Sequence, residues 1–426
     1  MRPFQIILLA VFVIAAIGGL VAFSLFKGTP AGGGPAVLDV WGSFPSSAFS
    51  TATADFSGDD FKLTYTEIRA DKFEQEFIEA LAAGRGPDAI ILPSDLVVRH
   101  GDKIVPIPLD TLSERKFKDS FVEAAEVFLS TTGAIAVPLT VDPLVAYWNR
   151  DRFGAANIAR PPRYWDELIT GTPRLVVRNR LGQIQSAAVS LGEFRNITNA
   201  KEILSALFFQ SGGKLVSRLP VQAGGTEGFA VSLEDWANAG SALGFFTEFA
   251  NPVKKLYTWN RGLPQSHNMF ASGDLALYFG FASEYAGLRE KNPHLNMSAT
   301  PFPQTRDSKL TVSFGKTWGL AALKTGKNPG GAIRLGFALA DSQRSVTLAN
   351  ALGTVPPLRA LLERKQESAA KSVFYEAALQ ARSFLDPNPT ETTKLFQSVV
   401  EDITGGRGQL TNGVGDLRSG LERLLR

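Results

Sequence analysis

The pattern of apolar and polar residues divides this chain into an uncharged N-terminal stretch and a long remainder of short, alternating segments. The uncharged stretch, Phe4 to Phe26, is long enough to cross a hydrocarbon core of ~30 Å at ~1.5 Å per residue. It predicts a transmembrane anchor at residues 4–26, followed by a flexible Gly- and Pro-rich linker at 27–36. Arg2 before it and Lys27 after it favour only weakly a cytoplasmic start. A cleaved signal peptide is the alternative, although no clear cleavage site follows.

After the linker, short apolar runs alternate with helical patterns. Residues 37–41 and 61–68 have the composition of strands, and residues 89–92 are apolar on both faces, as a central parallel strand requires. A helical pattern separates the second strand from the third. We therefore predict a β-α-β-α-β unit and an α/β fold with parallel crossovers.

The helix predicted between the second and third strands has readable ends. Its apolar face consists of Phe73, Phe77, Ile78 and Leu81. Asp71 is placed to cap its first turn, with Glu74 three residues later, and Gly84 can supply the left-handed residue that ends it. The pattern predicts a helix over residues 71–84.

Composition narrows the classes of function. A chain of 426 residues suits two lobes of ordinary size, and a net charge of +3 without a polybasic run argues against nucleic acid as a partner. With no cysteine, the chain has neither disulfides nor a lipid-modified cysteine. Its three histidines have no zinc spacing and no GxSxG nucleophile occurs, so we expect no enzyme activity, no metal and no cofactor.

Two aspartates follow predicted strands, at the sheet edge where ligands bind in parallel α/β folds. Asp95 ends the segment GRGPDAIILPSD at 84–95, and Asp142 lies in VPLTVDPLVAYWNRDRF at 137–153. Each carboxylate could accept hydrogen bonds from a hydroxyl-rich ligand. Each could instead cap the helix that follows, and capping is the commoner role for an aspartate just after a strand.

These two segments, followed by PPRYWDEL at 161–168, resemble in order and spacing the extracellular solute-binding proteins of ABC importers. The resemblance is to family 1, the carbohydrate-type, maltose-binding-protein-like group, and it extends over residues 37–426. Trp148 stands where that family usually has a tyrosine. Trp165, in the third segment, is expected in the core.

The resemblance implies a two-lobed periplasmic-binding-protein fold of type II, with each lobe a mostly parallel sheet flanked by helices. Residues 37–141 and 299–343 would form the first lobe, and residues 142–298 and 344–426 the second. Several crossings between the lobes would make a hinge.

The resemblance also implies that ligand binds between the lobes, and it favours a ligand role over capping for both aspartates. Aromatic rings suit this purpose because a sugar can pack its C–H face against them. The candidate ligand-binding residues are Trp41, Ser43, Phe44, Asp95, Asp142, Glu193, Trp259, Phe281, Trp318 and Thr354.

The implied function is an extracytoplasmic receptor that binds a small solute, with carbohydrate favoured, and delivers it to ABC permease subunits by hinge closure. The receptor would be held at the cell membrane by its single N-terminal span. One alternative is an anchored glycoside hydrolase with two carboxylates drawn from Asp95, Asp142 and Glu193. Another is a sensor or peptide-binding domain that reuses the fold.

Overall fold

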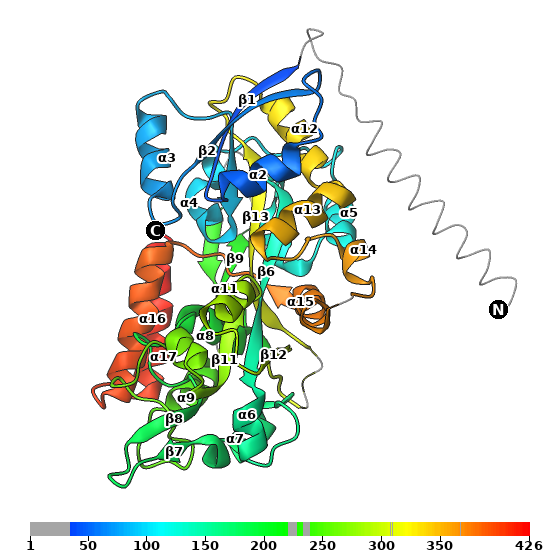
Figure 1. Cartoon of the computed structure of the whole chain (residues 1–426). Coiled ribbons are helices and arrows are strands. Elements are labelled where there is room, and N and C mark those ends of the chain that lie inside the picture. Colours follow the sequence, from blue (N-terminus) through cyan, green and yellow to red (C-terminus); the bar gives the residue numbers. More distant parts are fainter. Residues whose placement is uncertain (1–34, 220–227, 233–238, 307, 309, 367) are drawn as a thin grey trace, which may run out of the picture.

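The computed structural model describes residues 35–219, 228–232, 239–306, 308, 310–366 and 368–426. These residues form two lobes, one above the other in Figure 1, and the long strand β6 (Val137–Asn149) runs from the first into the second. The first lobe is built around the strands nearest the N-terminus. The second lobe holds the middle of the chain and its C-terminal helices.

The first lobe contains the predicted β-α-β-α-β unit. Strand β1 (Ala36–Gly42) lies between β2 (Phe61–Glu67) and β3 (Ala89–Pro93) and is parallel to both. Its principal helices are α2 (Ser46–Thr53), α3 (Phe73–Ala82), α12 (Pro329–Leu339) and α13 (Ser342–Leu352). Shorter elements are η1 (Ser94–Leu96), α4 (Val97–His100), η2 (Gly101–Lys103), α5 (Glu114–Ser120), η3 (Glu123–Phe128), β4 (Leu129–Ser130), β5 (Gly133–Ala134) and α14 (Arg359–Leu362).

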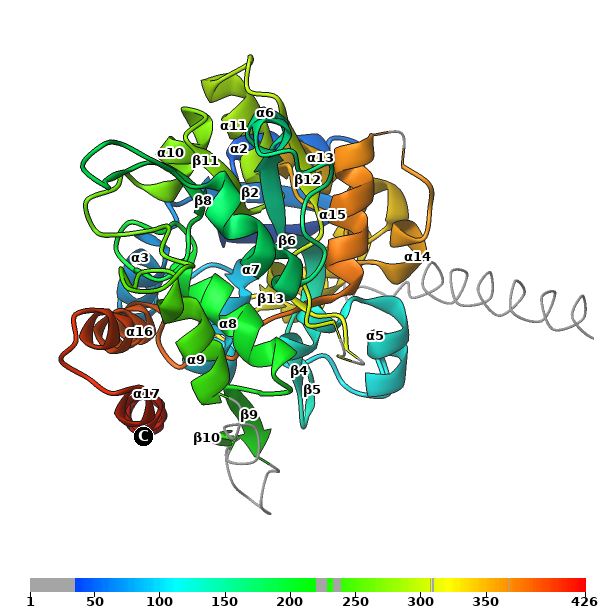
Figure 2. The ribbon, with the colours of Figure 1, turned by 90° about the horizontal axis from the view of Figure 1, so that it is seen from below.

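In the second lobe, helices surround the strands (Figure 2). Its strands are β7 (Val177–Arg178), β8 (Ile184–Val189), β11 (Leu275–Phe281) and β12 (Met297–Thr300), with a separate pair β9 (Val216–Leu219) and β10 (Gly228–Val231). Its helices are α6 (Arg150–Ala155), α7 (Trp165–Leu175), α8 (Ala200–Gln210), α9 (Ala239–Glu248), α10 (Ser266–Ala271), α11 (Glu284–Lys291), α15 (Ala369–Leu379), α16 (Pro389–Thr404) and α17 (Leu410–Leu424).

One sheet continues through both lobes, in the order β2-β1-β3-β13-β6-β11-β8-β7. Strand β13 (Ser313–Ala322) is antiparallel to β3 and β6, and β11 is antiparallel to β6 but parallel to β8. The short strand β14 (Ala381–Arg382) pairs with β13. The expectation of mostly parallel lobes therefore applies to β2-β1-β3 and β8-β11. It is wrong at the centre, because β13 runs opposite to both of its long neighbours.

The strand pairing shows where the chain passes between the two lobes. Residues 137–143 of β6 pair with β13, and residues 144–149 pair with β11 and β12. The chain is still hydrogen-bonded to the second lobe at Gln304, whose N–H donates to Arg163 O, and α13 packs on α2 of the first lobe. We propose that the second lobe extends to Gln304, not 298, and that the first lobe includes α13.

The helix predicted over residues 71–84 is α3, which is shorter at both ends. Phe73 and Phe77 are buried, whereas Ile78 is exposed. Asp71 does not cap the helix, because α3 begins two residues later and the carboxylate of Asp71 binds the Arg69 guanidinium instead. Gly84 has the predicted left-handed conformation, with φ of 66°.

The core covers both faces of β3. Ile90 and Leu92 belong to a large apolar cluster that spans both lobes, while Ala89 and Ile91 belong to a smaller one beneath α2 and α12. All four side chains are completely buried, which confirms the prediction that this strand is central. The buried run ends at Leu92, and β3 ends one residue later at Pro93, where the segment that contains Asp95 begins.

Among the described residues, no helix combines the length and the apolar character that crossing a membrane requires. The predicted transmembrane helix at 4–26 lies outside the described residues, as does the linker up to residue 34. Ala36, predicted as the end of the linker, is the first residue of β1.

Candidate ligand-binding site between the lobes

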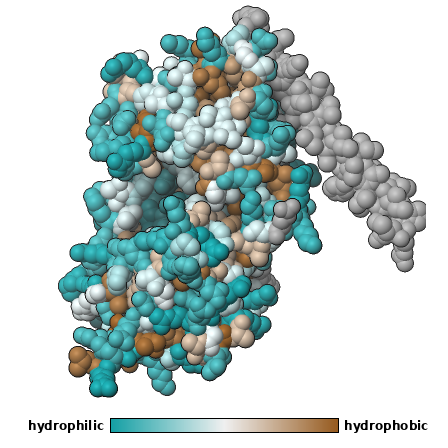
Figure 3. Space-filling view, viewed as in Figure 1, coloured by the Kyte–Doolittle hydropathy of each residue, from teal (hydrophilic) through white to brown (hydrophobic). Residues whose placement is uncertain are grey.

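The carboxyl ends of β1 and β3 lie at the edge of the first lobe that faces the second lobe (Figure 1). The segment beginning at Ser43 leaves β1 there, and η1, which contains Asp95, leaves β3. Figure 3 shows that the surface is hollowed between the upper and lower halves of the molecule. Parallel strand ends of this kind are where α/β proteins hold ligands.

Two of the predicted rings meet on one face of the sheet. Phe44 and Trp318 have ring centroids 6.0 Å apart at 58°. Trp318 is only partly buried, and it lies opposite Pro93 and Thr140 in the strand register. Trp41 is partly buried and packs against the large apolar cluster on the other face of the sheet. Phe44 is buried in the smaller apolar cluster, so the partly exposed Trp318 is the one of the two that presents ring surface beside the loops.

A lysine lies at the centre of the crossing between the lobes. Lys316 on β13 is opposite Asp142 on β6, and its Nζ is 3.0 Å from Glu202 Oε1 on α8 of the second lobe. The same ammonium lies 5.0 Å from the centroid of the Phe281 ring. Burial alone would lower the pKa of Lys316, but the carboxylates of Glu202, Asp95 and Asp142 outweigh it and raise that pKa. Lys316 is therefore charged at neutral pH and links the two lobes.

Asp142 is buried in β6, close to the point where this strand changes partner from β13 to β11. It is hydrogen-bonded to Ser283, at the start of α11. Its Oδ1 accepts from Ser283 N at 3.1 Å, and its Oδ2 accepts from Ser283 Oγ at 2.6 Å. Burial raises the pKa of Asp142 to about 7, against these two hydrogen bonds, which favour the charged form. Asp142 lies inside a continuous strand, so it does not cap a helix that follows it in the sequence.

Asp95 is partly exposed and accepts no hydrogen bond from any described residue. Burial raises its pKa, while the ammonium groups of Lys316 and Lys201 oppose that rise. The cap position of η1 is Pro93, and no side chain caps that helix, so the capping interpretation of Asp95 is wrong. Its carboxylate has free acceptor positions beside a charged lysine.

The second lobe contributes a cavity of about 390 Å³ beside the N-terminus of α8. Its lining residues come from the loop before α8, from α8 itself and from α16: Phe194, Arg195, Ile197, Asn199, Ala200, Lys201, Glu202, Thr393 and Gln397. The ionic groups around it are paired. Lys201 binds Asp386 at 2.8 Å, and Arg195 binds Glu401 through two hydrogen bonds of 2.6 and 2.9 Å.

The remaining predicted residues do not all face this space. Glu193 is buried and its Oε2 accepts from Arg261 Nε at 2.9 Å. Trp259 is completely buried in the core, where its Nε1 donates to Asn196 Oδ1 at 3.0 Å, so the prediction that it contacts ligand is wrong. Phe281 is buried beneath Lys316, and Thr354 is hydrogen-bonded to Thr140. An aromatic residue in a polar segment of the sequence can therefore lie in the core, as Trp259 does.

Lys316 and Glu202 are site residues that sequence reasoning missed. Lys316 is the single charged residue in the strand SFGKTWGLAA, where an isolated lysine indicates a buried or functional cation. Glu202 gives no such signal, because an acidic residue in the first turn of a helix is ordinary. Trp165 is in the core as predicted, and its Nε1 donates to Gln210 Oε1 at 2.6 Å.

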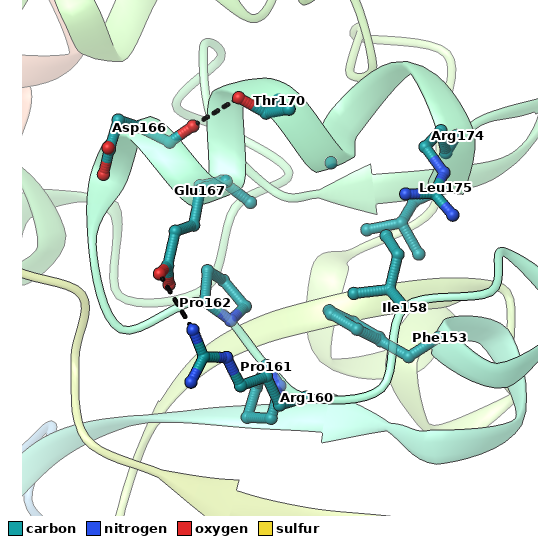
Figure 4. A pocket seen from close by; sticks show the side chains of 12 residues that line it. Phe153, Ile158, Arg160, Pro161, Pro162, Asp166, Glu167, Thr170, Arg174 and Leu175 are labelled. Carbon is teal, nitrogen blue, oxygen red and sulfur yellow. Dashed lines mark hydrogen bonds and ion pairs between the residues drawn. The ribbon is translucent and has the colours of Figure 1, made fainter.

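A second cavity, of about 300 Å³, lies in the second lobe between α6 and α7. Figure 4 shows Arg160 and Glu167 meeting at one end, with Phe153 and Ile158 on the opposite side. None of the ten predicted ligand-binding residues lines it. Within the described part of the chain, no group of three or more His, Cys, Asp or Glu residues could hold a metal ion.

Sequence comparisons place this chain among solute-binding proteins. A sequence profile described as bacterial extracellular solute-binding protein matches residues 45–338, which is more than half of the chain. A candidate binding protein of Brucella abortus (strain 2308) is 27% identical over 110 residues, which are 25% of this chain. That match takes in only about a quarter of the Brucella protein (26%).

Solved structures resemble the fold over nearly its whole length. A cyclo/maltodextrin-binding protein complexed with maltotetraose has a TM-score of 0.73 at 14% identity, covering 92% of this chain and 98% of that one. The sugar-binding protein MalE of Xanthomonas citri has a TM-score of 0.71 at 16% identity, covering 91% and 97%. An ABC transporter solute-binding protein of Thermotoga lettingae, bound with α-D-tagatose, has a TM-score of 0.65 at 16% identity, covering 92% and 100%. At such low identities the likeness shows the fold, and the matching profile shows the family. The chain belongs to the family of bacterial extracellular solute-binding proteins and has a two-lobed periplasmic-binding-protein fold.

Proposed function

We propose that this protein is a membrane-anchored extracytoplasmic receptor that binds an uncharged, hydroxyl-rich solute, a mono- or oligosaccharide, between its lobes. It would deliver that solute to an ABC permease when the lobes close. The observation that carries the proposal is the set of groups around the space between the lobes. The partly exposed Trp318, packed on the buried Phe44, supplies a ring surface, and Asp95 and Lys316 supply an acceptor and a donor.

The charge balance of the site favours an uncharged ligand. Lys316 is paired with Glu202, and Lys201 with Asp386, so the strong cations already have partners. A ligand anion would compete with those carboxylates and would meet Asp95 as well. A neutral hydroxyl group can instead donate a hydrogen bond to Asp95 without adding a buried charge. Its desolvation therefore costs less than that of an anion.

The ring surface favours a ligand with an apolar face. Pyranose rings place C–H groups on their faces and hydroxyl groups at their rims, and aromatic side chains bury the former at a low entropy cost. Two of the structural relatives are described as holding maltotetraose and α-D-tagatose. We therefore assign the ligand to saccharides as a class.

Hinge closure follows from how the chain crosses between the lobes. Strand β6 has one half in each lobe, and Lys316 on β13 reaches Glu202 in the second lobe. A ligand that touches both lobes only when they are closed shifts the population toward the closed form. We propose that the permease recognises this form, and that the N-terminal segment raises the local concentration of receptor near it.

The glycoside hydrolase alternative requires two carboxyl groups across a scissile bond. Asp142 is held by Ser283, and Glu193 by Arg261, while Asp95 accepts no hydrogen bond within the described residues. We therefore favour a receptor that returns its ligand intact.

The test is a thermal unfolding screen of the full chain against saccharides, polyols, nucleosides and short peptides. A ligand at a hundredfold excess over its Kd should stabilise the native state by about 2.7 kcal/mol. The proposal predicts that saccharides raise the unfolding temperature and are recovered unchanged by chromatography. Stabilisation by peptides alone, or recovery of a cleaved sugar, would overturn it.

A further inference from the structure

Two loops at the end of the second lobe each carry a strongly exposed apolar side chain. Leu181, in the turn between β7 and β8, is 83% exposed, and Val253, in the loop after α9, is 86% exposed. These are the two highest values among the exposed large apolar residues of the described chain. Figure 1 places β7 and β8 at the lower end of the molecule, where Figure 3 shows apolar residues among hydrophilic ones. Isolated exposed apolar residues are common on protein surfaces, so only their surroundings can indicate a role in binding.

An arginine joins the two loops into one surface. Arg178 donates to Gly182 O in the first loop at 3.3 Å and to Tyr257 O in the second at 2.5 Å. Its guanidinium also lies 4.9 Å from the centroid of the Tyr257 ring. The second loop is itself closed by hydrogen bonds from Lys254 N to Asn251 O and from Tyr257 N to Lys254 O. We call residues 177–183 and 251–257 together the lower tip.

The lower tip carries cations and no acidic residue of its own. Its cations are Arg178, Arg180, Lys254 and Lys255, and neither 176–190 nor 249–261 contains Asp or Glu. Lys254 is 3.6 Å from Glu248, just before the second loop. Arg180 and Lys255 are exposed, and within the described residues neither has a hydrogen bond or ion pair. The surface thus combines free positive charge with projecting apolar side chains.

We infer that the lower tip contacts the anionic headgroups of the membrane, with Leu181 and Val253 entering the interfacial layer. Basic residues near an anionic bilayer are attracted to its phosphates, and a shallow apolar insertion adds to that attraction. The apolar residues stand singly at the ends of turns and do not line a groove, which suits a fluid surface better than a shaped protein partner. Acidic protein surfaces are the competing class of partner, and the experiment below separates them.

This contact would determine how the receptor lies. Ala36, where β1 begins, and the β7–β8 turn are at opposite ends of the molecule (Figure 1). If the chain is attached near Ala36, contact at the lower tip lays its long axis along the membrane. The inference rests on the proposed membrane attachment, and it adds a second point of contact.

The test uses the absence of cysteine from the chain. The full-length Leu181→Cys variant, labelled with an environment-sensitive dye, is bound to phosphatidylcholine vesicles with and without phosphatidylglycerol. We expect the dye emission to move to shorter wavelength only on the anionic vesicles, and to revert in ~1 M salt, where the Debye length is about 3 Å. Leu109→Cys, at an exposed position in the first lobe, is the matched control and should not respond.

Adding Arg180→Gln and Lys255→Gln to the labelled variant should lower the ratio of docked to undocked tip about thirtyfold. An unchanged emission on anionic vesicles, or an equal change on neutral ones, would overturn the inference. Flotation of the full chain with neutral vesicles tests the attachment separately. A chain that floats but shows no response at residue 181 refutes only the tip contact.

Discussion

Replacing Lys316 by Met removes the ammonium group that lies 3.0 Å from Glu202 Oε1. Breaking a fully buried pair in this way costs ~3–5 kcal/mol, whereas an exposed pair contributes ~0–1 kcal/mol. The Lys316 side chain is 33% exposed and that of Glu202 is 11% exposed, so the site lies between these limits. We expect Lys316→Met to lower the free energy of unfolding by about 2 kcal/mol at pH 7.

The loss should depend on pH in a defined direction. Burial alone would raise the pKa of Glu202, but Lys316 and Lys201 together lower it below its ordinary value. Glu202 therefore stabilises the fold above its unfolded pKa of about 4.3, and the contribution is lost as pH falls through the lowered folded pKa. The variant lacks most of this contribution. The difference between wild type and variant should be complete at pH 7 and should shrink below about pH 4.

Urea unfolding of both proteins at pH 7 and below pH 4 measures this difference. Adding Glu202→Gln to Lys316→Met should restore part of the stability at pH 7, because it removes the unpaired carboxylate. Lys62→Met, at an exposed position on β2, is the control and should leave stability unchanged. An equal loss at both pH values, together with no recovery in the double variant, would refute the assignment of this ion pair.

Four further substitutions separate ligand contacts from structural groups. Asp95→Asn should weaken saccharide affinity by about tenfold or more in calorimetry, since a charged hydrogen bond contributes ~1.5–3 kcal/mol; an unchanged Kd would exclude that contact. Asp142→Asn should abolish a fall in stability with rising pH. Because the pKa of Asp142 is about 7 in the fold and ~3.9 unfolded, the contribution of Asp142 to stability is largest below pH 4 and is lost as pH rises through 7, and the variant's unfolding free energy against pH would lack this component. Trp318→Ala should weaken saccharide binding about tenfold with little loss of stability, whereas Trp259→Ala should destabilise by ~3–5 kcal/mol in urea unfolding. The reverse outcome for these two tryptophans would contradict their placement.

The first lobe could be predicted well from local pattern. The strands at 37–41, 61–68 and 89–92 correspond to β1, β2 and β3, because each is a short apolar run bounded by turn residues. Strand partners could not be predicted in the same way. Hydrophobic pattern identifies a strand but not its partner, so it could not show that β12 pairs with the far half of β6.

The candidate site was predicted in part for a similar reason. Position after a strand identified Asp95 and Asp142, since the end of a strand is visible in the sequence. The hydrogen bonds of Ser283 to Asp142 and the pairing of Lys316 with Glu202 join residues 141 and 114 positions apart (283 − 142 and 316 − 202), which no local pattern reveals. Trp259 was misassigned because an aromatic residue in a polar loop has the same sequence appearance in the core and in a cleft.

The central claim, ligand-driven closure of the lobes, is tested most directly by a distance measured across the space between them. Helices α3 and α16 lie on the same side of the molecule, one in each lobe (Figure 1). Spin labels on Glu76→Cys and Ser398→Cys, both at exposed positions in a chain without cysteine, report their separation in the full-length protein. We expect a saccharide from the thermal screen to shorten this distance and to narrow its distribution. A distribution that is identical with and without a tightly bound saccharide would contradict it.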